Sequence, residues 1–164
     1  MHARLPTVAL LLGVAGLLPF IGCGILAVSP GTTETAKQGV LALLAYGAVI
    51  LGFLGGVHWG FALRPMPEGV VLPDAANRTR LAIGVVPSLI GWLALLAPLG
   101  GVPDLGLAVL IVGFLAVVLT ETQLSRRGLM PGGYMWLRWG LSVIVLMVLI
   151  TVLTLRLIGA SIVL

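Results

Sequence analysis

Residues 46–63 are the most informative stretch of this chain, and they read YGAVILGFLGGVHWGFAL. None of them is Asp, Glu, Lys or Arg, and most are apolar. Crossing the hydrocarbon core of a bilayer as an α-helix takes about 20 such residues, and the apolar residues before Tyr46 supply the rest. The stretch therefore predicts a transmembrane helix.

Four more apolar runs lie on either side of this one, with polar loops between them. The chain of 164 residues is 60% apolar and 9% charged, whereas soluble domains are about 25% charged. We predict an all-α membrane protein, a single transmembrane domain (residues 1–164) built as a bundle of five transmembrane helices. The predicted spans are residues 5–28, 36–63, 81–97, 105–124 and 135–158.

The basic residues predict how this bundle is oriented. Only Lys37 and Arg156 fall on one side of the implied membrane. Because short cytoplasmic loops carry an excess of Lys and Arg, we expect the N-terminus to be cytoplasmic and the C-terminus to lie on the opposite side. The residues assigned to the cytoplasmic side are Arg4, Arg64, Arg78, Arg80, Arg126, Arg127 and Arg138.

Charge and composition also indicate the partner and the location. The net charge is +4, but the basic residues are scattered in ones and twos, which is typical of anchors beside anionic lipid and argues against a nucleic-acid site. The excess of Arg over Lys, together with the many Ala, Gly and Leu residues, is typical of a GC-rich bacterial genome. We expect a multi-pass protein of the bacterial inner (plasma) membrane, whose partner is the lipid bilayer.

Several residues predict where the helices begin and bend. Thr32 or Thr33 can cap the second span, and Asp104 can cap the fourth. Pro19 is expected to bend the first span and Pro87 to kink the third, because proline lacks the N–H group that a helix interior needs.

Small residues recur every four positions in the second span, at Ala48, Gly52, Gly56 and Gly60. This spacing places them along one side of the helix, and small residues let two helix backbones approach closely in lipid. We interpret the stripe as the packing seam against another helix of the same bundle, which makes the second span the central helix. The alternative is the seam of a homodimer.

Two titratable residues lie inside the predicted spans, His58 and Glu121. His58 comes six residues before Arg64, or about 9 Å along the helix, and Glu121 lies at a similar depth in the fourth span. Such residues are functional candidates because burying them in lipid is costly. If the two spans touch, Glu121 can orient or protonate His58. The alternatives are a neutral His58 bonded to a carbonyl group, and a Glu121 paired with Arg64, Arg80 or Arg127.

Neighbouring residues extend these two into a candidate polar site at the cytoplasmic ends of the second to fourth spans. Tyr134, Trp136 and Trp139, together with Arg138, are interpreted instead as an interfacial belt. The candidate polar site comprises His58, Trp59, Arg64, Ser88, Trp92 and Glu121.

No catalytic set, cofactor site or metal site is predicted. Cys23 is the sole cysteine, which excludes an internal disulfide and a multi-thiolate metal site. His2 is the only other histidine and lies outside the spans, so a haem held by two histidines would need two copies of His58 across a dimer. Motifs of metalloproteases, P-loop proteins and serine hydrolases are missing.

Residues 46–60 resemble the signature of domain of unknown function 3429, a family of small, transmembrane-protein-69-like, multi-pass membrane proteins. Three other segments are similar to that family in the expected order: GLLPF at 16–20, VPSLIGWL at 86–93, and LMPGGY at 129–134 running into Leu137 and Arg138. The resemblance covers most of the chain. It implies a small multi-pass protein of bacterial inner membranes or mitochondria, and it implies no particular activity.

The expected function is that of a non-enzymatic accessory or assembly partner of a larger membrane complex, because the spans hold few polar groups and little chain lies outside them. The alternative is a protein that binds or transports a small molecule (a quinone, a lipid or a solute) at the candidate polar site. Proline-broken helices beside a polar cluster are typical of such sites.

Overall fold

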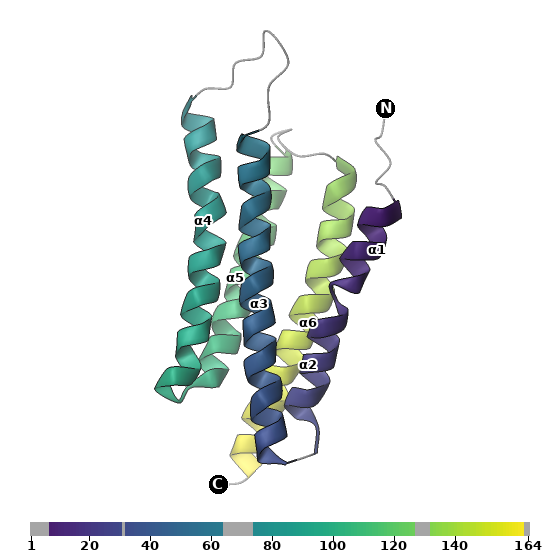
Figure 1. The fold of residues 1–164 in the computed structure, drawn as a ribbon, viewed down its shortest axis with the longest axis vertical. Coiled ribbons are helices and arrows are strands. Elements are labelled where there is room, and N and C mark those ends of the chain that lie inside the picture. Colours follow the sequence, from purple (N-terminus) through teal and green to yellow (C-terminus); the bar gives the residue numbers. More distant parts are fainter. Residues whose placement is uncertain (1–6, 31, 64–73, 127–131, 163–164) are drawn as a thin grey trace.

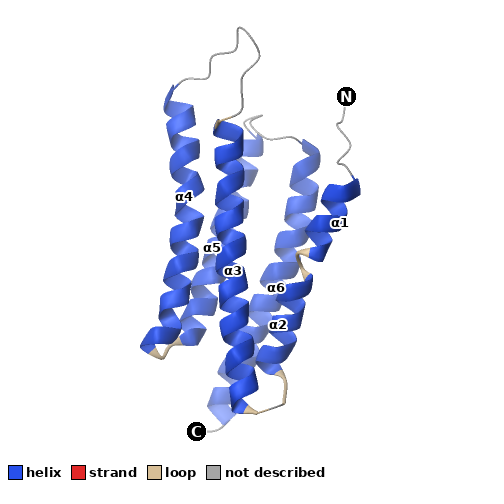
Figure 2. Cartoon of the chain, in the orientation of Figure 1, coloured by secondary structure: helices blue, strands red, loops and turns tan. Residues whose placement is uncertain are grey.

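The computed structural model is a bundle of long helices that run side by side (Figure 1). It describes residues 7–30, 32–63, 74–126 and 132–162, and within these ranges it contains no β-strand (Figure 2). In chain order the helices are α1 (Thr7–Ala15), α2 (Leu18–Val28), α3 (Thr33–Ala62), α4 (Asp74–Leu96), the short 3₁₀ helix η1 (Ala97–Gly100), α5 (Pro103–Arg126) and α6 (Gly132–Ile162).

In the described part of the chain, five segments are long and apolar enough to cross a membrane, which confirms the predicted all-α membrane bundle. The start of α1 and the end of α6 lie at opposite ends of the bundle (Figure 1), as five crossings require. The side on which each end lies stays a prediction. The segments are Thr7–Val28, Thr33–Gly60, Leu81–Gly100, Pro103–Arg126 and Met135–Gly159.

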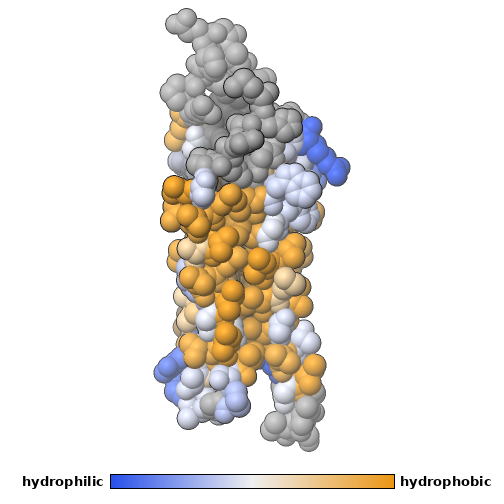
Figure 3. Space-filling view, turned by 90° about the vertical axis from the view of Figure 1, so that its right-hand side faces the viewer, coloured by the Kyte–Doolittle hydropathy of each residue, from blue (hydrophilic) through white to orange (hydrophobic). Residues whose placement is uncertain are grey.

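The outer surface of the bundle suits lipid. A hydrophobic band covers its middle, and hydrophilic residues gather toward the ends (Figure 3). Large apolar side chains such as Leu12, Phe53 and Val112 are about two-thirds exposed, at 68%, 67% and 64%. In water this surface would be unfavourable, whereas lipid tails solvate it without cost.

α3 is central to the packing, because it contacts α2, α4 and α5, while α6 closes the other side against α1, α2 and α5. The core between them is filled by Leu and Phe side chains. The ring of Phe20 packs edge-on against those of Tyr46 and Phe114, with centroid separations of 4.9 and 5.8 Å. The predicted central place of the second span therefore agrees with these contacts.

α3 and α4 approach each other so closely at several glycines that a larger residue at those positions would clash. A Cβ atom added to Gly55 would lie 2.1 Å from the carbonyl oxygen of Gly84, and one added to Gly91 would lie 2.9 Å from Cα of Ala48. Gly52 faces Ser88 of α4 at contact distance. This seam follows Ala48, Gly52 and Gly55.

The predicted stripe of small residues lies only partly in this seam. Ala48 and Gly52 belong to it, but a Cβ atom added to Gly56 or Gly60 would have no neighbour within 4 Å. The reason is geometric: an α-helix turns about 100° per residue, so each step of four residues rotates about 40° around the axis. Gly60 therefore lies about 120° away from Ala48, on the exposed face of α3.

The first span is broken into α1 and α2 at Gly16 and Leu17, one turn before Pro19. The bend expected at Pro19 is thus a full interruption, because the proline ring displaces the preceding carbonyl groups from the helical ladder. The hydroxyl of Tyr46, on α3, donates a hydrogen bond of 2.9 Å to the carbonyl oxygen of Gly16. The carbonyl group of Gly16 at the break is therefore hydrogen-bonded within the protein.

The remaining predictions about helix ends have mixed outcomes. Thr32 caps α3, since its hydroxyl accepts a hydrogen bond from the N–H of Thr35. Asp104 was expected to cap the fourth span, but α5 begins before it, at Pro103, and its carboxylate accepts from the guanidinium of Arg156 instead. α4 continues through Pro87, and the predicted kink there stays a prediction.

Candidate functional site

Four polar side chains are buried in the described part of the bundle, and together they form what we term the polar cluster: His58, Glu121, Arg138 and Ser142. Their exposures are 1%, 0%, 6% and 1%. They come from three helices, α3, α5 and α6, near the ends of α3 and α5 and the start of α6 (upper end in Figure 1).

Helical periodicity explains why each of these side chains points inward. Glu121 continues the buried stripe of α5, three and four residues after Val118 and Val117. Arg138 and Ser142 are four residues apart on α6, and the same face continues with Val145. Residues at such spacings share one side of a helix. The residues of the polar cluster thus stand on the buried faces of their helices, in line with the apolar core residues.

Glu121 lies between two basic side chains. Nε of Arg138 donates to Oε2 of Glu121 at 2.6 Å, which ties α6 to α5. On the other side, Nε2 of His58 lies 3.8 Å from Oε1 of Glu121. Nη1 of Arg138 donates to the hydroxyl oxygen of Ser142 at 2.9 Å, which holds the guanidinium in place.

Two atoms of this ion pair keep unused hydrogen-bonding capacity. Oε1 of Glu121 and Nη2 of Arg138 are buried and have no hydrogen-bond partner among the described residues. A buried polar atom left in this state costs about 1–3 kcal/mol. The polar cluster can therefore accept one hydrogen bond and donate another to a molecule placed beside it.

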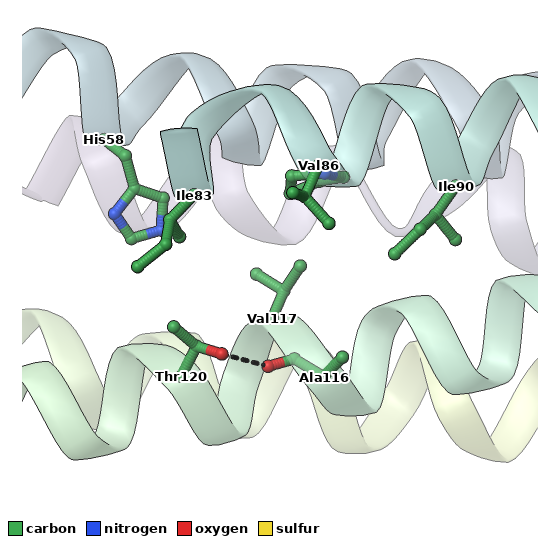
Figure 4. A pocket seen from close by; sticks show the side chains of 8 residues that line it. His58, Ile83, Val86, Ile90, Ala116, Val117 and Thr120 are labelled. Atoms are coloured by element: carbon green, nitrogen blue, oxygen red, sulfur yellow. Dashed lines mark hydrogen bonds between the residues drawn. The ribbon is translucent and has the colours of Figure 1, made fainter. Parts of the chain in front are cut away.

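Two cavities adjoin the polar cluster. The first, of about 110 Å³, lies between α3, α4 and α5 and is bordered by His58 (Figure 4). Thr120 also borders it, but its hydroxyl donates to the carbonyl of Ala116 on its own helix at 2.8 Å, which leaves His58 as the main polar group. The other lining residues are Ile83, Val86, Pro87, Ile90, Ala116 and Val117.

The second cavity, of about 160 Å³, is bordered by Arg138 and lies where the first span is broken. Its volume is close to that of an engineered apolar cavity of about 150 Å³ that binds benzene. Apart from Arg138, its lining is apolar. The other lining residues are Leu12, Gly13, Gly16, Leu17, Phe20, Ile50, Phe53, Leu54, Phe114, Leu141 and Val145.

Comparison with known proteins places this chain in a family. The family model described as Protein of unknown function (DUF3429) matches residues 5–154. The chain belongs to this family. The membership agrees with the five membrane-crossing helices and confirms the resemblance seen in residues 46–60.

Two curated relatives carry the name Transmembrane protein 69. The protein from the frog Xenopus tropicalis is 46% identical over 92 residues, which is 56% of this chain and 33% of that protein. The mouse (Mus musculus) protein is 39% identical over 92 residues, which is 56% of this chain and 34% of that protein. The matched segment thus spans about a third of each relative. No solved structure matches this chain.

Of the residues predicted for the site, His58 and Glu121 are brought within 3.8 Å of each other by α3 and α5, which is the arrangement considered for the case that the two spans touch. Trp59 follows His58 in the sequence, but its side chain faces outward and is 43% exposed. Its indole N–H donates a hydrogen bond to the carbonyl of Leu81 at 3.1 Å. Ser88 and Trp92 are exposed on α4 and lie outside the polar cluster.

Three basic residues weighed in the prediction cannot be compared in the same way. Arg64 and Arg127 lie outside the described residues, and the side chain of Arg80 is not among those described. The partner that the structure gives to Glu121 is a different arginine, Arg138.

Arg138 is a correction to the sequence prediction, which placed it in the interfacial belt. It is 6% exposed and points into the bundle, while its neighbours Trp136 and Trp139 are 85% and 40% exposed. Ser142 was missed as well. The available signal was their spacing of four residues on the stripe that continues at Val145, whereas a belt assignment rests on composition alone.

The donor set does not suit a metal ion. Nowhere in the described residues do three or more His, Cys, Asp or Glu side chains gather closely enough to hold one. The polar cluster provides one imidazole and one carboxylate, and the carboxylate is already bound to a guanidinium. Its chemistry is that of hydrogen bonding and charge pairing.

Proposed function

We propose that this protein binds a small, membrane-soluble organic molecule at the polar cluster. The observation that carries the proposal is a buried ion pair with two unused atoms, Oε1 of Glu121 and Nη2 of Arg138, of which Arg138 borders an apolar cavity. A bound molecule that supplies their missing hydrogen bonds would recover the free energy that their burial costs.

The cost of the ion pair supports a functional role for it. Replacing a buried ion pair with apolar residues of similar size is often neutral or stabilising, so packing alone does not require Glu121 and Arg138. Ionisable residues in the membrane interior mark ligand or ion paths by default. Stability is thus a weaker explanation of the pair than ligand binding.

The cavity at the broken first span favours one class of ligand. Arg138 can donate a charge-assisted hydrogen bond to a carbonyl or carboxylate oxygen, and the apolar lining around it suits a ring or an acyl chain. The ligand class is therefore a largely apolar molecule with a hydrogen-bond-accepting head, such as a quinone or an acyl lipid. Its route is from the bilayer, because both cavities lie between membrane-crossing helices.

Extraction of the protein in native lipid particles, followed by mass spectrometry of the bound small molecules, tests this function. The decisive variant is the double substitution Glu121→Leu and Arg138→Met, which removes the polar pair but keeps the core apolar. We expect the wild-type protein to carry a defined molecule and the double variant to lose it while its melting temperature is kept or raised. Gln123→Ala, on an exposed position of α5, is the control and should retain the molecule.

The same ligand bound equally by the wild-type protein and the double variant would contradict the proposal. So would a wild-type protein that carries only bulk lipid in the proportions of the membrane.

A second candidate function is that of an accessory or assembly partner of another membrane protein. Gly56 and Gly60 favour it, because both are exposed on α3 and a Cβ atom added to either would have no neighbour within 4 Å among the described residues. A helix of another protein could approach the backbone there, next to Phe53. Gly56→Leu should abolish co-purification of such a partner and leave ligand binding unchanged; a second copy of this chain as the lost partner would identify a homodimer.

A further inference from the structure

We propose a second binding site, at the opposite end of the bundle, for the head group of an anionic phospholipid. The two basic residues that the sequence places on that side of the membrane, Lys37 and Arg156, border the same cavity. Its volume is about 370 Å³, whereas one water molecule occupies about 30 Å³ of the liquid. This proposal is independent of the ligand proposed for the polar cluster.

Three separate parts of the chain build this cavity. Lys37 comes from the start of α3, Arg156 from the end of α6, and Pro98, Gly101 and Pro103 from the turn between α4 and α5. α3 and α6 extend beyond that turn at the lower end of the bundle (Figure 1), and the molecule is hollowed at this end (Figure 3). The apolar side chains of Val40 and Leu41 complete the lining.

The charges in and around the cavity favour an anion. Asp104 accepts a hydrogen bond from Nε of Arg156 at 2.5 Å. A guanidinium has five N–H donors, so those on Nη1 and Nη2 are not part of this contact. No carboxylate in the described ranges forms an ion pair with Lys37. The lining itself holds two cations and no carboxylate. Asp104 pairs with Arg156, and Glu34, one turn before Lys37 on α3, accepts a hydrogen bond from the side chain of Gln38. The wall of the cavity is therefore basic, which favours an anionic group.

The depth of the two cations matches a lipid head group. Lys37 is four residues from the start of its span at Thr33, and Arg156 is three residues from the end of its span at Gly159. At 1.5 Å per residue both lie within about 6 Å of the span ends. Basic side chains near a span end often extend into water, but the side chain of Arg156 does not. It is bound to Asp104 and is only 25% exposed. Basic pockets between membrane helices bind anionic lipid head groups on the cytoplasmic side, and Lys37 and Arg156 offer the same charge pairing on the opposite side.

The test is native mass spectrometry of the purified full chain, titrated with phosphatidylglycerol or with phosphatidylcholine of the same acyl chains. We expect retained adducts of phosphatidylglycerol only. Lys37→Gln should weaken that binding about 5-fold, since one basic residue beside an anionic lipid surface has about that effect. The matched control is Arg126→Gln, which removes an exposed cation from the other end of the bundle and should leave binding within about 2-fold of the wild type.

Arg156→Gln alone would leave Asp104 without its partner, so the second test variant is the double substitution Asp104→Asn and Arg156→Gln. Because it removes the guanidinium donors, it should weaken the binding of phosphatidylglycerol at least as much as Lys37→Gln does, while remaining folded by circular dichroism. Equal retention of the two lipids, equal effects of Lys37→Gln and Arg126→Gln, or displacement of the lipid by millimolar inorganic phosphate would each overturn the assignment. The last result would indicate a site for a free anion.

Discussion

At the scale of single residues, Glu121 links the two basic members of the polar cluster. Its carboxylate is fully buried, accepts a hydrogen bond from Arg138, and lies 3.8 Å from the ring of His58. The charge of Arg138 is compensated by this one carboxylate, since Ser142 offers only a neutral hydroxyl. Removing the negative charge would leave a cation in an apolar interior.

Glu121→Gln should therefore lower the free energy of unfolding in mild detergent by about 3–5 kcal/mol, the usual cost of breaking a buried ion pair on one side. Denaturant titration of the purified protein measures this change. Gln123→Ala, two residues away and exposed, should shift the unfolding curve by less than about 0.5 kcal/mol. A Glu121→Gln protein as stable as the wild type would show that the pair is absent.

Sequence reasoning found two of the four residues of the polar cluster. His58 and Glu121 could be predicted because they are titratable residues inside apolar runs. Arg138 was misplaced because it stands between Trp136 and Trp139, and a composition of this kind is typical of an interfacial belt. The direction of its side chain depends on how α6 is rotated against α5, and one sequence does not contain that rotation.

At the scale of helices, a backbone contact between α3 and α4 lies next to the first cavity. Gly55 and Gly84 lie at the closest approach, and Pro87 and Ile90 of α4 line the cavity. The existence of a small-residue seam could be predicted from the spacing of residues in α3. Its register could not, because a repeat of four and the helical period of 3.6 diverge within three steps.

This seam gives a prediction with a neighbouring control. Gly55→Ala places a Cβ atom against the backbone of Gly84 and should reduce the free energy of unfolding by about 3 kcal/mol, the upper range for overpacking. Gly56→Ala meets open space and should be neutral or stabilising by up to about 1 kcal/mol, because alanine is the better helix former. Unfolding in mixed micelles separates the two, and an equal response would refute the seam.

At the scale of the whole molecule, five membrane-crossing helices and the match to the family agree. The number and approximate bounds of the spans could be predicted because lipid forces backbone hydrogen bonds into helices, so hydropathy carries most of the information. The bend expected at Pro19 is a full break one turn earlier, at Gly16, whose carbonyl oxygen accepts a hydrogen bond from Tyr46 of another helix. A hydrogen bond between residues 30 positions apart cannot be predicted from the sequence around the break alone.

The odd number of spans gives a prediction for the complete chain in its membrane. Reporter tags fused to the two ends should report opposite compartments, with the N-terminal tag in the cytoplasm, because most basic residues lie at that end of the bundle. Accessibility labelling of the tags in intact and permeabilised cells measures this. Two ends in the same compartment would be inconsistent with five crossings.

The most direct test of ligand binding at the polar cluster is an experimentally determined structure of the protein extracted with its native lipid. The geometry predicts non-protein density in the cavity at the broken first span, within hydrogen-bonding distance of Nη2 of Arg138. A cavity closed by apolar side chains, or an Arg138 whose guanidinium is fully bonded to protein groups, would contradict it.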